Sequence, residues 1–184
     1  MKEQHVNYET LLKVSNTISH SIEPEEVALM TVEGITTALE LKGCTLFWLN
    51  NKTHELEIAA SFGLSDEYLH KGPISALHSI AESLQDGPVA ISNVMLDPRL
   101  QYPEAATKEG ISSILSLPIQ IGGKILGAIR VYTSTPYVFT PSEITFISAL
   151  AQITGLSIKL AKYSRGLMNS IDVLKSMKEE QPHQ

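Results

Sequence analysis

The sequence lacks most of the residues on which disulfide, metal and nucleic-acid chemistry depend. Its single cysteine, Cys44, can form neither an internal disulfide nor a multi-thiolate metal site, which agrees with a reducing compartment. Acidic residues outnumber basic ones, 20 to 14, which argues against binding a nucleic-acid backbone or an anionic membrane. The N-terminus has no apolar signal region, and the longest uncharged helical run, 144–158, is too short to span a bilayer. We therefore expect a soluble, cytoplasmic protein without nucleic-acid or membrane partners.

What is present suits one domain with terminal extensions. The 184 residues are 43% hydrophobic, which is enough for a single core in a domain of roughly 150 residues. We assign residues 1–163 to this domain, with its N-terminal helix included. Residues 164–184 are expected to form a C-terminal helical extension of coiled-coil type that ends in a disordered tail.

The clearest local signal is the segment 112–133, in which two apolar runs flank Gly122 and Gly123. Both glycines can adopt positive φ, so the segment predicts a β-hairpin with strands 114–121 and 124–132. These strands carry few charges, so we place the hairpin in the middle of a sheet that is covered on both faces. Pro118 lacks a backbone donor, which predicts a bulge or an unpaired position there.

The preceding segments predict two helices, a second hairpin and a group of short elements. Apolar periodicity indicates a helix over 8–21, and a second helix begins at Pro24 and ends at Gly43. Strands are expected at 44–49 and 55–61, joined by a turn at 50–53. Further on come a short helix at 76–84, a strand at 89–92, and a helix from Pro103 to a cap at Gly110. Short helices with long loops are typical of a cover over a small-molecule pocket, although such loops can also be mere connections.

A long helix follows, because Thr140, Pro141 and Glu143 match a capping box with proline at the first helical position. Beyond it, apolar residues recur at alternating spacings of three and four, with one polar interruption. This seam comprises Ala149, Ile153, Leu156, Leu160, Tyr163, Leu167, Ser170, Leu174 and Met177. The first half of the helix can lie against the sheet, whereas the second half requires a partner helix. We therefore expect a homodimer formed through the terminal helices.

The order of elements predicts an α+β fold. The chain over roughly 8–163 resembles a GAF domain in the order and spacing of several short motifs. These are Asp97-Pro98-Arg99, Gly110, Ser113, Ser116-Leu117-Pro118-Ile119, Gly127 and Phe139-Thr140-Pro141. The resemblance implies a GAF/PAS-like antiparallel sheet of five or six strands, with terminal helices on one face and a pocket covered by short helices and loops on the other. It also implies a sensory or regulatory role, commonly as a dimer.

Departures from the family patterns reduce the number of ligands and activities that this sequence could have. Cyclic-nucleotide-binding members share an Asn-Lys at the end of the last strand and an Asp-Glu after the following Phe, where this sequence has Tyr132-Thr133 and Glu143-Ile144. Bilin-binding members need a thiol near the cover, whereas Cys44 lies in the first predicted strand. The methionine sulfoxide reductases of this fold use several cysteines. We therefore expect no covalent bilin, no cyclic nucleotide and no enzymatic activity.

The histidines, the cysteine and Asp97 can each be explained without a ligand or a reaction. His70 and His78 flank Lys71-Gly72-Pro73, but no second ligand has the usual spacing, so we expect solvent exposure rather than binding of haem or a metal. Cys44 has no neighbouring cation that would lower its pKa, which favours a buried thiol over a redox sensor. Asp97 is interpreted as a turn residue that binds its own loop backbone.

The best candidates for pocket chemistry are Arg130 and Tyr132, which lie two apart on one strand and therefore share a face. The hairpin register places Arg130 opposite either Leu115 or Ile114, and the sequence leaves this open. If Arg130 is buried it needs an anionic partner, which could be a carboxylate ligand or a protein carboxylate; alternatively it reaches solvent at the sheet edge. Around it we predict a ligand site formed by Arg130, Tyr132, Phe62, Ile80, Tyr102 and Ser116.

Two functions remain open from the sequence. The domain is either a small-molecule sensor that passes ligand occupancy through its dimerisation helices to a separate effector protein, or a ligand-free dimerisation and protein-interaction module. A pocket of a few hundred cubic ångströms with converging polar groups would favour the sensor. The sequence does not name the ligand.

Overall fold

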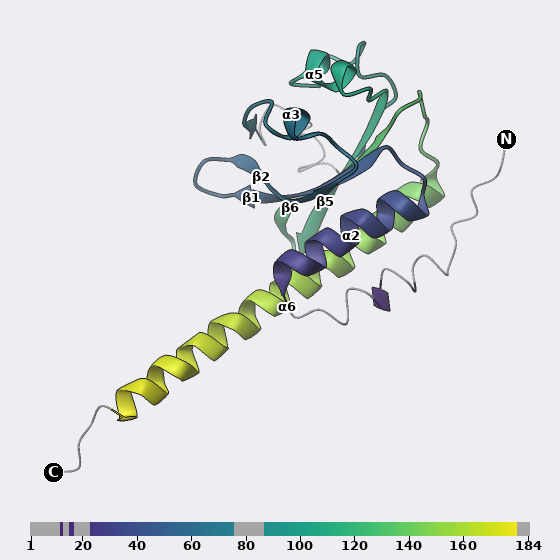
Figure 1. Ribbon diagram of the computed structural model, residues 1–184. Coiled ribbons are helices and arrows are strands. Elements are labelled where there is room, and N and C mark those ends of the chain that lie inside the picture. Colours follow the sequence, from purple (N-terminus) through teal and green to yellow (C-terminus); the bar gives the residue numbers. More distant parts are fainter. Residues whose placement is uncertain (1–11, 13–14, 17–22, 76–86, 180–184) are drawn as a thin grey trace.

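The central hairpin forms as its glycines predict (Figure 1). In the computed structural model, which describes residues 12, 15–16, 23–75 and 87–179, β5 (Ser113–Ile121) and β6 (Lys124–Thr133) are antiparallel. Gly122 and Gly123 have φ of 59° and 75°, so both turn positions lie in the left-handed region that only glycine adopts without strain.

The hairpin is the middle of a six-stranded sheet with the order β3-β2-β1-β6-β5-β4. The other strands are β1 (Gly43–Asn50), β2 (Glu55–Phe62), β3 (Ile74–Ser75) and β4 (Val89–Ile91). Between β1 and β2, the Asn50 side chain accepts hydrogen bonds from the backbone N–H groups of Lys52 and Thr53 at 2.9 and 3.2 Å and closes the predicted turn. All the strand pairs are antiparallel, so the expected α+β fold is confirmed.

The hairpin register differs from both predicted alternatives. Pro118 pairs regularly with Ala128, and the register shifts one residue later, between Ile119 and Gln120. Ile119 pairs with Gly127 and Gln120 with Ile125, so the extra residue lies on β6, the strand opposite the proline. The prediction of a bulge at Pro118 was therefore misplaced.

The neighbouring strand β1 approaches β6 very closely next to this extra residue. A Cβ atom at Gly127 would lie 1.9 Å from the carbonyl oxygen of Phe47 on β1, so the neighbouring strand approaches closer than any side chain allows. Because of the added residue, Arg130 pairs with Ser116, and neither Leu115 nor Ile114 lies opposite it.

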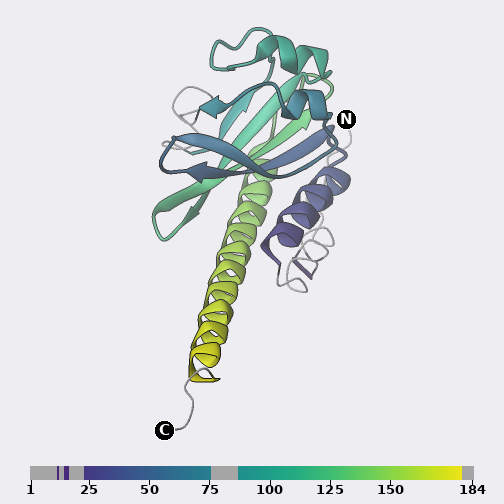
Figure 2. The ribbon, with the colours of Figure 1, turned by 60° about the vertical axis from the view of Figure 1, so that its left-hand side comes forward.

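Two helices cover one face of the sheet (Figures 1 and 2). Helix α2 (Pro24–Ala38) lies antiparallel to the first half of α6 (Pro141–Glu179), because the buried hydroxyls of Thr31 and Thr154 are 3.2 Å apart near the middle of α2, whereas Arg165 on α6 reaches its start. Their apolar residues and those of the central strands form the main core. It includes Val27, Val32, Ile35, Cys44, Leu46, Leu115, Leu117, Ile129, Val131, Ile147 and Leu150.

Helix α2 ends earlier than predicted. Its last residue is Ala38, whereas Gly43 is already the first residue of β1. The Leu41 N–H donates back to the Thr36 carbonyl at 3.0 Å, and Glu40 adopts a φ of 50°, so the chain turns out of the helix without a glycine.

Helix α6 begins with the predicted capping box. The Glu143 carboxylate accepts hydrogen bonds from the Thr140 N–H and hydroxyl at 2.8 and 2.9 Å, and the Glu143 N–H donates to the Thr140 hydroxyl at 3.3 Å. The helix then projects well beyond the sheet (Figure 2). An ion pair from Arg165 to Glu23 and Glu25 joins it to the start of α2.

Two different apolar stripes run along α6. The stripe on the sheet contains Phe146, Ile147, Leu150, Ala151 and Ile158, all buried. The predicted seam faces away from the sheet, with Ile153, Leu156, Leu160, Tyr163 and Leu167 exposed. The expectation that the first half of the helix lies on the sheet is confirmed, but residues outside the seam make that contact.

By length and composition alone, the part of α6 over Pro141–Asp172 could cross a membrane, since a window within it reaches a mean hydropathy of 1.5. The apolar part of α6 is therefore longer than the uncharged run 144–158 indicated. However, 44% of that window is buried inside the domain, so packing within the domain explains part of its apolar composition.

Short elements lie over the other face of the sheet. Helix α3 (Asp66–Leu69) was not predicted, and α5 (Pro103–Lys108) is followed by Gly110, whose φ of 74° matches the expected cap. The predicted helix 76–84 and tail 180–184 lie outside the described residues, as does most of the predicted helix 8–21.

Candidate functional site

A row of polar side chains crosses the covered face of the sheet. Ser61 on β2 pairs with Thr45 on β1, Thr45 with Arg130 on β6, and Arg130 with Ser116 on β5. Residues directly opposite one another in antiparallel strands share a face, so these four lie side by side across four strands. The Thr45 and Ser61 hydroxyls are 3.0 Å apart. We call this set the polar row.

Arg130 is the charged centre of the polar row and is only 4% exposed. Its guanidinium carbon lies 5.2 Å from the ring centroid of Phe47, and Tyr132 is close enough to affect its pKa. Burial lowers the pKa of Arg130, while the nearby Tyr132 and Tyr68 raise it. A guanidinium is not deprotonated under physiological conditions, so the row holds a fixed positive charge.

Two tyrosines connect this charge to the cover. Burial raises the pKa of Tyr132 to about 12, although the charge of Arg130 acts to lower it. Tyr68, from α3, meets Tyr132 edge to face with 6.0 Å between ring centroids. Both phenols remain protonated at neutral pH and can therefore donate hydrogen bonds.

A second cation lies on the outer side of Tyr68. The Lys71 ammonium is 3.7 Å from the Tyr68 ring centroid and donates to the Tyr68 carbonyl at 2.9 Å. Burial, and next the charge of Arg130, lower the pKa of Lys71 to about 8. The charge of Arg130 thus disfavours the charged form of Lys71.

The cover contains an open pocket beside this cluster. A cavity of about 510 Å³ lies between α3 and α5, within the size range of small-molecule sites. Its wall consists of Ser65, Glu67, Tyr68, His70, Lys71, Ala105, Lys108 and Glu109. The carboxylates on this wall have partners: Glu67 pairs with Lys108, and Glu109 accepts the Ser65 N–H at 3.0 Å and lies 3.6 Å from the Lys42 ammonium.

The predicted site residues separate into groups. Arg130, Tyr132 and Ser116 lie on the covered face of β5 and β6. Tyr102 lies at the start of α5, where its hydroxyl donates to the Pro73 carbonyl at 2.8 Å and so ties two parts of the cover together. Ile80 lies outside the described residues, and the ligand-binding role of the whole set stays a prediction.

Phe62 lies apart from the polar row. It pairs with Cys44, whose side chain belongs to the helix-covered core, so the register places Phe62 on that same face, 39% exposed at the end of β2. An extra residue in β2, where Leu46 pairs with Ala60 but Phe47 with Ile58, changes the alternation along this strand.

Sequence reasoning missed Thr45, Ser61, Tyr68 and Lys71. Thr45 carried a weak signal, because it is the one hydroxyl in the apolar run Cys44-Thr45-Leu46-Phe47 and period-two alternation puts it opposite the core-facing Cys44. Lys71 carried none, since its position over Tyr68 depends on a loop.

The simpler interpretations of three residues can be compared with the structure. Cys44 is fully buried and burial raises its pKa, which confirms the structural thiol. Asp97 accepts hydrogen bonds from the Arg99 N–H at 3.0 Å and Nε at 2.9 Å, as a turn residue does. His70 Nδ1 is 2.8 Å from the Asp66 carbonyl, and within the described ranges no three His, Cys, Asp or Glu side chains gather as a metal site; His78 lies outside those ranges.

Comparison with known proteins identifies the fold. The chain is similar to the GAF domain of a phosphoenolpyruvate-protein phosphotransferase from Coxiella burnetii, with a TM-score of 0.78, 18% identity, and coverage of 90% of this chain and 99% of that one. It is also similar to free methionine-R-sulfoxide reductase from Neisseria meningitidis, solved with its substrate, with a TM-score of 0.75, 12% identity, and coverage of 89% and 95%. A domain of a putative two-component sensor histidine kinase from Sinorhizobium meliloti 1021 is 25% identical, with a TM-score of 0.64 and coverage of 77% and 95%.

At the level of sequence, no curated protein is a significant match. The GAF domain family, in contrast, matches residues 23–158, which include α2, all six strands and the sheet-bound half of α6. GAF domains are generally sensory or regulatory modules of signalling proteins, although some proteins of this fold are enzymes. With most of its length matched, this chain belongs to the GAF domain family.

Proposed function

We propose that this protein is a non-enzymatic sensor of a small anionic molecule in the bacterial cytoplasm. The ligand binds between the sheet and its cover and alters the terminal helices, which pass the signal to a separate effector protein. The observation that supports this best is the polar row, because it places a guanidinium beside several hydroxyls on one face of the sheet, and these are groups that can bind an anion together.

A carboxylate is the ligand group that fits this chemistry best. The guanidinium of Arg130 can donate two parallel hydrogen bonds to a carboxylate. The hydroxyls of Thr45, Ser116 and Tyr132 lie on the same face, and the Lys71 ammonium adds a second positive charge from the cover. The pocket between α3 and α5 offers a route from solvent to Tyr68, which contacts Tyr132.

Connectivity supports the transfer of the signal to the long helix. Tyr132 lies one residue from the end of β6, and the loop that follows leads directly to the capping box of α6. The Ser113 hydroxyl of β5 accepts the Tyr137 N–H of this loop at 2.8 Å, so the hairpin and the loop are joined. Displacement of the hairpin by a ligand would therefore reach α6.

A thermal-shift screen of small carboxylates, purines and tetrapyrroles on the full chain tests the proposal, since a ligand that binds the folded state raises its stability. Arg130→Ala should abolish the shift caused by a carboxylate hit, with an expected loss of about 2 kcal/mol of binding free energy, as for a charge-assisted hydrogen bond. Arg99→Ala, which removes an arginine bound to its own loop, is the matched control and should leave the shift unchanged. A hit that binds Arg130→Ala as tightly as wild type would exclude Arg130 from the site.

A second function is favoured by one specific observation, the exposed apolar seam of α6. Leu160 and Leu167 are 59% and 66% exposed, on a helix that projects beyond the sheet. In this alternative the domain is a ligand-free dimerisation and interaction module, and the seam is its working surface. A full-length protein that dimerises but responds to no member of the screen would favour this alternative over the sensor.

A further inference from the structure

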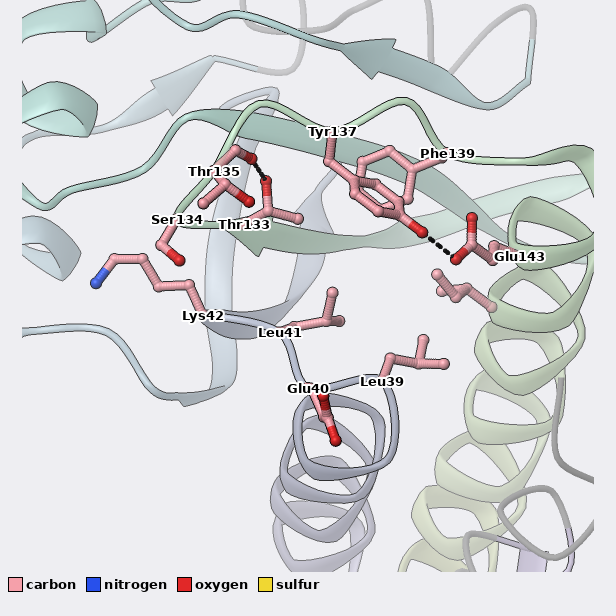
Figure 3. A pocket seen from close by; sticks show the side chains of 11 residues that line it. Leu39, Glu40, Leu41, Lys42, Thr133, Ser134, Thr135, Tyr137, Phe139 and Glu143 are labelled. Atoms are coloured by element: carbon pink, nitrogen blue, oxygen red, sulfur yellow. Dashed lines mark hydrogen bonds between the residues drawn. The ribbon is translucent and has the colours of Figure 1, made fainter. Parts of the chain in front are cut away.

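A second cavity lies at the junction of the two long helices, away from the polar row. Its volume is about 160 Å³, and its wall is formed by the end of α2, the end of β6 with its following loop, and the start of α6. The lining residues are Leu39, Glu40, Leu41, Lys42, Thr133, Ser134, Thr135, Tyr137, Phe139, Glu143 and Ile147 (Figure 3). It shares no lining residue with the pocket between α3 and α5.

The cavity contains a buried carboxylate. Glu143 is only 5% exposed, and its oxygens accept hydrogen bonds from the Tyr137 hydroxyl at 2.5 Å and from the N–H and hydroxyl of Thr140 at 2.8 and 2.9 Å. All three donors are neutral. The hydrogen bond to Glu143 raises the pKa of Tyr137 to about 12, so that hydroxyl keeps its proton.

The other charges in the wall have both signs, because the start of α6, which carries the partial positive charge of a helix N-terminus, also lies there. The end of α2 carries the partial negative charge of a helix C-terminus, and this helix, described in full, has no basic residue in its last turn. Glu40 adds a second carboxylate. The cation in the lining, Lys42, has its ammonium 3.6 Å from Glu109 and points away from Glu143 (Figure 3).

The remaining wall is apolar and aromatic. Leu39, Leu41 and Ile147 supply alkyl surface, and the rings of Tyr137 and Phe139 lie edge to face with centroids 5.1 Å apart. Aromatic faces attract cations as well as alkyl groups. A cavity of this size is close to the roughly 150 Å³ that holds a benzene molecule in a protein core.

We propose that this junction cavity binds a small organic cation, a primary alkylammonium of about five non-hydrogen atoms. The ammonium lies toward Glu143 and the end of α2, and the alkyl chain contacts Leu39, Leu41 and Phe139. This site is additional to the proposed anion site and does not depend on it. Because Glu143 also caps α6, an occupant would tie the end of α2 to the first turn of the long helix.

The experiment uses butylammonium chloride as the probe on the full chain. Thermal shift and isothermal titration should show saturable binding at millimolar concentrations, whereas 1-butanol and sodium chloride at equal concentrations should show none. Glu143→Gln keeps an oxygen acceptor and a capping-box side chain but removes the charge, so it should fold and bind butylammonium at least tenfold more weakly.

Two further variants keep the test decisive. Ser134→Phe places a ring at an exposed lining position and should block the probe even if Glu143→Gln folds poorly. Glu67→Gln removes an exposed carboxylate from the other pocket and should bind butylammonium as wild type does. Absence of saturable binding to the wild-type protein, or equal affinity of Glu143→Gln and wild type, would overturn the proposal.

Discussion

The two faces of the sheet differ in composition, because one is apolar and the other carries polar side chains at its centre. The face under α2 and α6 is lined by Leu, Ile and Val side chains that form the largest core cluster. The covered face carries Arg130, Thr45 and Ser116 across its centre and forms two smaller apolar clusters. Both faces come from the same strands, since alternate residues of β5 and β6 point to opposite sides. The helix face therefore supplies most of the apolar core, whereas the covered face carries the polar groups to which we assign ligand binding in the proposed function.

The sharpest test of this difference uses adjacent residues of β5. Leu117 is fully buried in the helix-side core, whereas Ser116 belongs to the polar row. Leu117→Ala should lower the free energy of unfolding by about 3 kcal/mol, because it leaves a cavity, whereas Ser116→Ala should lower it by about 1 kcal/mol. Denaturant titration measures both values. Equal losses at the two positions would contradict the division of roles.

A change at the turn should disturb both faces together. Gly122 and Gly123 have positive φ, which valine adopts only with strain, so the double replacement by Val should cost about 2 kcal/mol. Thermal denaturation gives the comparison, and Lys124→Val, at the neighbouring exposed strand position, serves as the control. A double variant that melts at the wild-type temperature would refute the turn assignment.

The same contrast between two sides exists on α6, where one apolar stripe is buried and the other is exposed. Leu160→Lys or Leu167→Lys should weaken self-association at least tenfold, about 1.4 kcal/mol, because the charge enters the proposed dimer seam. Removal of 167–184 should act in the same direction. Leu96→Lys, at an exposed loop leucine, is the control. Sedimentation of the wild-type chain as a monomer at tens of micromolar would contradict the dimer.

The smallest expected effect concerns pH on the covered face. Lys71 has a pKa of about 8, so its ammonium helps to bind a carboxylate below that pH, and affinity should fall as the pH rises past it. The loss should be about threefold, since a partly exposed charge contributes under 1 kcal/mol. Arg130 stays charged throughout.

The effect of Lys71 on folding stability should not account for this loss of carboxylate affinity. Between pH 8 and the ordinary lysine value of 10.5, unfolded Lys71 binds more protons than folded Lys71, so this group makes the unliganded fold more stable as pH rises. Titration of a carboxylate hit from pH 7 to 9 provides the measurement. In Lys71→Met the affinity should be lower and nearly independent of pH; a pH dependence that survives this substitution would assign it to another group.

Local chemistry predicted those parts of the fold that neighbouring residues determine. Gly122-Gly123 specify the turn, Thr140 and Glu143 specify the helix start, and Gly110 specifies the cap. The polar row was only partly predictable, because it depends on two bulges. The extra residue in β6 lies next to Gly127, which Phe47 approaches from 80 positions away, and nothing in the hairpin sequence encodes that contact. The junction cavity likewise joins three segments distant in sequence.

The continuity of α6 has a mechanical consequence. The helix contains 39 residues, so its axis is about 58 Å long at about 1.5 Å per residue. A tilt of about 5° at its capped end would displace Glu179 by about 5 Å, close to the rise of one helical turn. In the proposed function, the helix would carry a small displacement beside the hairpin to its projecting end, where the displacement is largest. An effector protein would then need only to detect the position of that projecting end.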